Sequence, residues 1–68
     1  MPVSMPYPEL AKLAWEAQQR ANDCAAAALD RHRAGLPVDA ACYANAARAN
    51  QQDATALFWL LDAAGTQS

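Results

Sequence analysis

The chain has 68 residues, 54% of them hydrophobic, and a formal net charge of −2 at pH 7. A chain this short forms one domain at most, and its own core leaves a thin margin of stability without a disulfide, a metal or a partner subunit. The charges are few and scattered, which argues against a nucleic-acid partner, and no segment approaches the ~20 apolar residues of a membrane span.

The chain begins with a proline-containing arm at residues 1–7, which we expect to be extended because Pro2 and Pro6 disfavour helix. This start lacks the basic and apolar regions of a secretory signal, so we expect a cytoplasmic protein. One helical-hairpin domain is predicted at residues 8–65, and a frayed tail follows at 66–68.

Two helices are predicted within this domain. Nothing breaks a helix over residues 8–34, and Gly35 ends it; a turn follows at 35–38. Asp39 is the predicted N-cap of a second helix over 39–64. Helices of similar length joined by a short connection pack antiparallel. The predicted fold class is therefore all-α, an antiparallel two-helix hairpin.

Each predicted helix carries a seam of small and apolar residues that alternates by four and three positions. The first seam comprises Leu10, Ala14, Ala17, Ala21, Cys24 and Ala28, and the second comprises Tyr43, Ala47, Asn50, Ala54, Leu57, Leu61 and Ala64. Asn50 is the polar exception, predicted to set the register or the number of partners. The outer face of the first helix is a solvated acidic line of Glu9, Glu16, Asp23 and Asp30.

The open end of the hairpin, away from the turn, is more apolar than one hairpin can bury. The five consecutive apolar residues at 57–61 are ~100° apart and therefore occupy the whole circumference of a helix, of which one neighbouring helix covers only one side. A turn centred near residues 36–37 also places Leu13 opposite Leu61. We therefore predict an interface comprising Leu10, Leu13, Trp15, Leu57, Phe58, Trp59, Leu60 and Leu61.

A homodimer that completes a four-helix bundle is the simplest partner for this end, because a self-complementary patch needs no second gene. A larger protein is the other predicted partner. A third reading is that the arm covers the apolar run through Val3, Met5 and Tyr7.

We expect the cysteines and the histidine to form no catalytic or metal site. In the predicted register Cys24 and Cys42 are offset by ~12 Å along the helices, beyond the reach of a disulfide. His32 lies opposite Cys42, but no third residue orients it, and a structural metal site needs about four ligands. We expect no enzyme activity, no cofactor and no metal, with His32 at the negative end of the first helix.

The predicted function is protein–protein interaction, of an adaptor, co-chaperone or inhibitor type. A DNA-binding regulator is the alternative, in which Asn45, Gln51 and Gln52 contact bases. Arg48 alone among these neighbours would attract phosphate, which makes this alternative weaker.

The layout of the chain can be compared with that of known small helical proteins. It consists of a helix that ends at Arg33 to Gly35, a turn that contains proline, and a second helix with Tyr43 near its start and leucines near its C-terminus. In length and layout the chain resembles the small helical-hairpin co-chaperones of type III secretion needle subunits. The resemblance implies that the apolar open end holds a partner chaperone or an aggregation-prone subunit. Small phage-encoded inhibitors of host proteins share this size and also act by occupying a surface on a larger protein.

Overall fold

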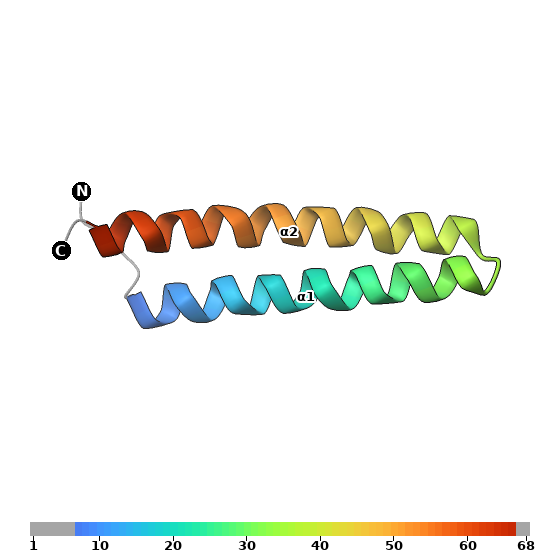
Figure 1. The fold of residues 1–68 in the computed structure, drawn as a ribbon, viewed down its shortest axis with the longest axis horizontal. Helices are drawn as coiled ribbons and strands as arrows, with labels where there is room; N and C mark the ends of the chain where they lie inside the picture. The colour runs from blue at the N-terminus through green and yellow to red at the C-terminus, as the bar shows by residue number, and fades with distance from the viewer. Residues whose placement is uncertain (1–6, 67–68) are drawn as a thin grey trace.

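The computed structural model describes residues 7–66, which form two α-helices, α1 (Tyr7–Arg33) and α2 (Pro37–Thr66). The helices run antiparallel and side by side, as a rod with extents of 50 × 17 × 16 Å (Figure 1). The described range contains no strand, so the predicted all-helical hairpin is confirmed. Predictions for residues 1–6 of the arm and residues 67–68 of the tail lie outside the described residues.

A glycine ends α1. Gly35 has a φ of 79°, a left-handed conformation that glycine adopts without a Cβ penalty. The Gly35 amide donates to the His32 carbonyl at 3.1 Å, and the Leu36 amide donates to the Arg31 carbonyl at 2.9 Å. These two bonds form a Schellman motif, which satisfies the last carbonyls of the helix.

The prediction of Asp39 as the N-cap of the second helix is wrong by about one turn. α2 begins at Pro37, because the fixed φ of proline suits the first helical position and its missing amide is not needed there. The Leu36 carbonyl accepts from the Ala40 amide at 2.9 Å, which places Leu36 at the N-cap. Asp39 lies in the first turn, where its charge favours the positive helix end.

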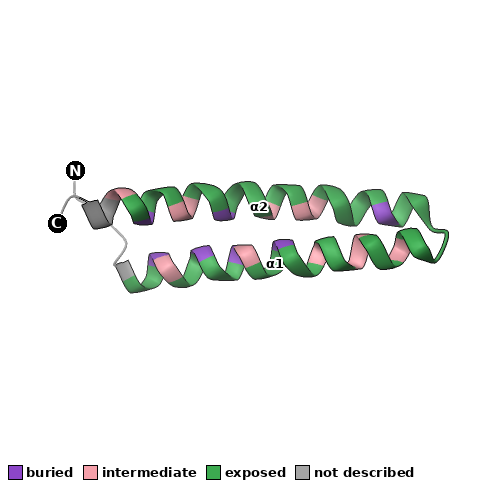
Figure 2. Ribbon diagram, in the orientation of Figure 1, coloured by how far each residue is buried: buried purple, intermediate pink, exposed green. Residues whose placement is uncertain are grey.

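The core lies along the two predicted seams, which face each other (Figure 2). Its buried hydrophobic residues are Leu10, Ala14, Ala17 and Ala21 of α1, and Ala40, Ala54 and Leu61 of α2. Five of these seven are alanines, so the helices approach closely but bury little apolar surface. Ala40 extends the second seam by one position toward the turn, whereas Tyr43 remains 37% exposed.

Side-chain pairs reveal the register of the two helices. Gln18 and Gln51 exchange two amide hydrogen bonds, of 2.9 and 3.1 Å, and Arg20 Nε donates to Asn50 Oδ1 at 3.0 Å. The numbers of these paired residues add to 69 or 70, whereas the predicted register has them add to about 74. At mid-hairpin these pairs are therefore shifted by about one helical turn from the predicted register. The residue numbers of the Trp15–Phe58 ring pair and the Arg31–Tyr43 contact add to 73 and 74, close to the predicted sum.

Candidate protein-binding surface

Part of the predicted interface is used inside the hairpin itself. Leu10, at 4% exposure, and Leu61, at 8%, form a buried cluster with Ala14. Leu57 and Phe58 are half-buried and pack against this cluster. Leu61 thus shares a buried cluster with Leu10 and Ala14. These residues hold the two helices together at the open end.

The other four residues of the predicted interface remain on the surface. Leu13 is 39% exposed and Leu60 is 46% exposed, while Trp15 and Trp59 expose 65% and 70%. The Trp15 ring meets Phe58 edge to face, with centroids 5.3 Å apart and an interplanar angle of 87°. This contact orients the Trp15 ring on the flank of the hairpin while leaving most of its surface open to a partner.

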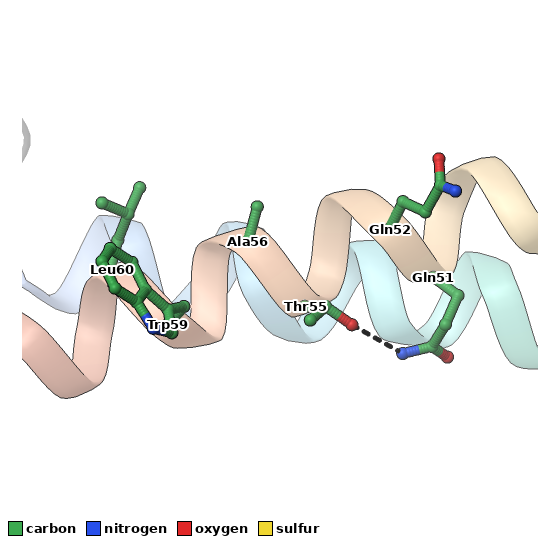
Figure 3. A pocket seen from close by; sticks show the side chains of 6 residues that line it. All are labelled: Gln51, Gln52, Thr55, Ala56, Trp59 and Leu60. Carbon is green, nitrogen blue, oxygen red and sulfur yellow. Dashed lines mark hydrogen bonds between the residues drawn. The ribbon is translucent and has the colours of Figure 1, made fainter.

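A shallow groove of about 590 Å³ lies on α2 at the same end (Figure 3). It is lined only by α2 residues, which are Gln51, Gln52, Thr55, Ala56, Trp59 and Leu60. Figure 3 shows the glutamines at one end and the Trp59 and Leu60 side chains at the other, with Ala56 between them. Gln51 Nε2 donates to Thr55 Oγ1 at 3.4 Å. The groove offers an apolar floor for a side chain of another protein, with amides beside it.

The sequence prediction of the interface omitted four of these groove residues. Gln51 and Gln52 were weighed only as contacts to DNA bases, and Thr55 and Ala56 were not singled out. Spacing in the sequence could have identified Gln52 and Ala56, because they lie seven and three positions before Trp59, on the same face of α2.

Exposed apolar side chains also occur near the turn, away from the predicted interface. Leu29 is 50% exposed, Leu36 44% and Val38 74%. Single exposed apolar residues are common on protein surfaces. These three lie too far from the open end to belong to the same patch, but Val38 lies on α2 and extends its apolar face toward the turn.

Asn50 lies half-buried in the seam and its amide is satisfied on both sides. Its Nδ2 donates to the Ala46 carbonyl at 2.9 Å, while its Oδ1 accepts from Arg20. Within the part of the chain that the structure describes, no buried side-chain nitrogen or oxygen lacks a partner. The predicted register-setting role of Asn50 stays a prediction.

The groups with chemical reactivity are dispersed. Cys24 is half-buried and Cys42 is exposed, and both are free thiols. His32 is exposed in the last turn of α1. Across residues 7–66 no three histidine, cysteine or acidic side chains gather into a group that could hold a metal ion. No helix in the described chain is long and apolar enough to cross a membrane.

No protein-family model matches this chain, and no curated protein or solved structure matches it at a significant level.

Proposed function

We propose that this hairpin is a non-catalytic module that binds protein through the exposed apolar side chains of its open end. The observation that carries the proposal is the exposure of two tryptophans, Trp15 at 65% and Trp59 at 70%. Tryptophan is rare on surfaces that stay in water and is enriched among the residues that dominate binding energy. Leu13 and Leu60 are further exposed apolar side chains at this end of the hairpin.

The energy available at this patch is comparable to the stability of the fold. Covering Trp59 and Leu60 would contribute about 1.5 to 3 kcal/mol for each side chain, before the entropy of association is subtracted. A domain of this size is expected to have a total stability of roughly 3 to 10 kcal/mol. A partner would therefore stabilise the hairpin appreciably.

The partner we propose is a second copy of this chain, so that two hairpins form a four-helix bundle. A symmetric dimer covers the same patch on both copies and is the commonest assembly of soluble proteins. A larger protein could occupy the patch in an adaptor, co-chaperone or inhibitor role. The two free thiols fit a reducing compartment, so we propose that the protein acts in the cytoplasm.

Two measurements test the proposal. Sedimentation equilibrium under reducing conditions gives the mass across a wide concentration range, and quenching of fluorescence by acrylamide reports whether the tryptophans are accessible to solvent. A Trp15→Phe variant leaves Trp59 as the only indole, and its quenching should fall as the mass rises to that of two chains. A Trp59→Ala variant should dissociate, whereas Leu29→Ala, which removes a 50% exposed leucine far from the open end, should not.

Two results would contradict the proposal in different ways. The mass of a single chain at every concentration would exclude the homodimer. An assembled state in which acrylamide still reaches Trp59 would exclude this surface as the interface.

A further inference from the structure

The face of α2 that points away from α1 carries a second heptad pattern. Seven exposed residues alternate by four and three positions and form what we term the outer seam: Val38, Cys42, Asn45, Ala49, Gln52, Ala56 and Trp59. At ~100° per residue this line lies on the opposite side of α2 from buried Ala54 and Leu61. The groove in Figure 3 is one section of the outer seam, around Ala56. α2 therefore has two seams, of which α1 covers one.

We propose that α2 docks along the outer seam, antiparallel, on α2 of a second copy of this chain. The inference rests on the proposed function, because it names the partner and the face through which the two copies meet. The four helices would then lie in the order α1, α2, the partner's α2 and the partner's α1. The four helices then form one row, in place of the bundle proposed above, with Trp59 inside the interface and Trp15 of α1 outside it.

The sizes of the outer-seam residues favour the antiparallel direction. In an antiparallel pair each layer joins residues whose numbers add to 101, about a two-fold axis between residues 50 and 51. Trp59 then meets the partner's Cys42, Gln52 meets the partner's Ala49, and Asn45 meets the partner's Ala56. Every larger side chain faces a small one, which allows the helices to interdigitate. The ring of Trp59 also gains a sulfur contact.

A parallel pair would fit poorly. It would place each residue against its own copy, so that the two Trp59 rings meet in one layer and the Ala56 residues face each other in the next. The large layers would hold the helices apart and the small layers would leave voids, which lose contacts on both sides.

Charge selects α2, rather than α1, as the face that a second copy covers. The outer seam contains no charged residue, whereas the outward line of α1 carries four exposed carboxylates: Glu9, Glu16, Asp23 and Asp30. Docking that line on the outer seam would take the carboxylates out of water without basic partners, at a large desolvation cost. Docking α1 on α1 would bring two acidic lines together. Only α2 on α2 leaves all of these carboxylates solvated.

The area is sufficient for a reversible dimer. From Val38 to Trp59 the outer seam is about 32 Å long, and a third of the circumference of a solvated helix over that length is roughly 450 Å². Two copies would bury about 900 Å² in total, which is below the roughly 1,200 to 2,000 Å² of specific stable interfaces and in the range of weak, transient ones. We therefore expect exchange between monomer and dimer.

Disulfide trapping tests the register directly in the full chain. In a Cys24→Ala/Cys42→Ala background, Asn45→Cys and Ala56→Cys are made as separate single-cysteine variants. In the antiparallel dimer, position 45 lies in one layer with position 56 of the partner, while like positions are ~16 Å apart. Mixed oxidation should therefore give the 45–56 heterodisulfide at least tenfold faster than either variant links to itself. Self-linkage at the same rate would overturn the inference.

A charge substitution tests the same face without cysteines. Ala49→Glu places a carboxylate in the outer seam and should raise the dimer dissociation constant at least tenfold. Ala26→Glu adds the same charge at an exposed position of α1 and should leave it unchanged. An unchanged constant for Ala49→Glu would overturn the inference.

The outcomes separate this inference from the proposed function. A dimer by sedimentation that gives no 45–56 disulfide would overturn the outer seam while keeping self-association. A monomer at every concentration would overturn both the outer seam and the homodimer.

Discussion

At the scale of single residues, alanine determines how the core is built. Ala14, Ala17 and Ala54 are fully buried, at 0% exposure, and each occupies a position where the two helix backbones come close. Because alanine has a single methyl group, the helices can approach without displacing larger side chains. The same property limits the apolar area that the core removes from water.

Replacement of Ala17 with leucine should therefore destabilise the hairpin. Leucine adds three carbon atoms where no space is free, and overpacking of this kind costs about 1 to 3 kcal/mol. For a domain of this size each kcal/mol lowers the melting temperature by roughly 4 to 8 °C, which circular dichroism can follow. Ala26→Leu, at an exposed position of the same helix, is the matched control and should melt like the native chain. Equal melting of both variants would refute the close approach of the helices.

At the scale of the elements, the turn is determined by Gly35 and Pro37 together. The left-handed glycine ends α1, and the proline begins α2 two residues later, so the chain reverses over residues 34–36. α2 therefore begins two residues earlier than the predicted start at residue 39.

Replacement of Gly35 with alanine tests this turn. A Cβ at Gly35 would meet no heavy atom within 4 Å, so the substitution introduces no clash. Its effect comes from the backbone alone, since an L-residue at φ 79° is disfavoured by about 1 to 2 kcal/mol. Gly35→Asn should lose less, because asparagine tolerates this conformation better. Thermal unfolding that ranks alanine at or above asparagine would contradict the expectation.

The two helices differ in what their outer faces offer. α1 places its acidic line in water, as expected of a helix that buries one face only. α2 has few charges and carries mostly small and apolar residues on its inner and outer faces, with Asn45 and Gln52 as the polar members of the outer seam. A helix that is apolar on two sides normally has two neighbours, and the hairpin provides one.

At the scale of the whole molecule, the hairpin exposes more surface than a compact chain of its mass. Its accessible surface is 5082 Å² at 7.3 kDa, whereas a compact monomer of this mass is expected to expose about 4,200 Å². The excess follows from the rod shape, which puts most side chains at the surface. Association is the means of reducing this area.

The melting temperature should therefore rise with protein concentration. If unfolding is coupled to dissociation, a hundredfold increase in concentration stabilises the folded state by up to about 2.7 kcal/mol. Calorimetry or circular dichroism over this range would measure the shift. Added reductant should leave the melting temperature unchanged, because both thiols are free. A melting temperature independent of concentration would indicate a hairpin that is stable as a monomer.

Much of the fold follows from local rules that operate within a few residues. The heptad spacing marked Leu10, Ala14, Ala17 and Ala21 as the inner face of α1, and the structure buries all four. The end of α1 was predicted to within a residue, since only glycine adopts the left-handed conformation readily. The antiparallel direction followed from the short connection.

Only the tertiary structure decided the axial register, that is, which residues of the two helices lie side by side. Periodicity identifies the face of a helix but leaves its shift along the axis free, because positions one turn apart look alike. The observed register places Leu61 in one buried cluster with Leu10 and Ala14. The exposure of Trp59 follows from its position on the outer face of α2. The sequence by itself determined two helices and their inner seams. The tertiary structure decided how far along the axis the two seams pair, because the sequence pattern is the same for positions one turn apart.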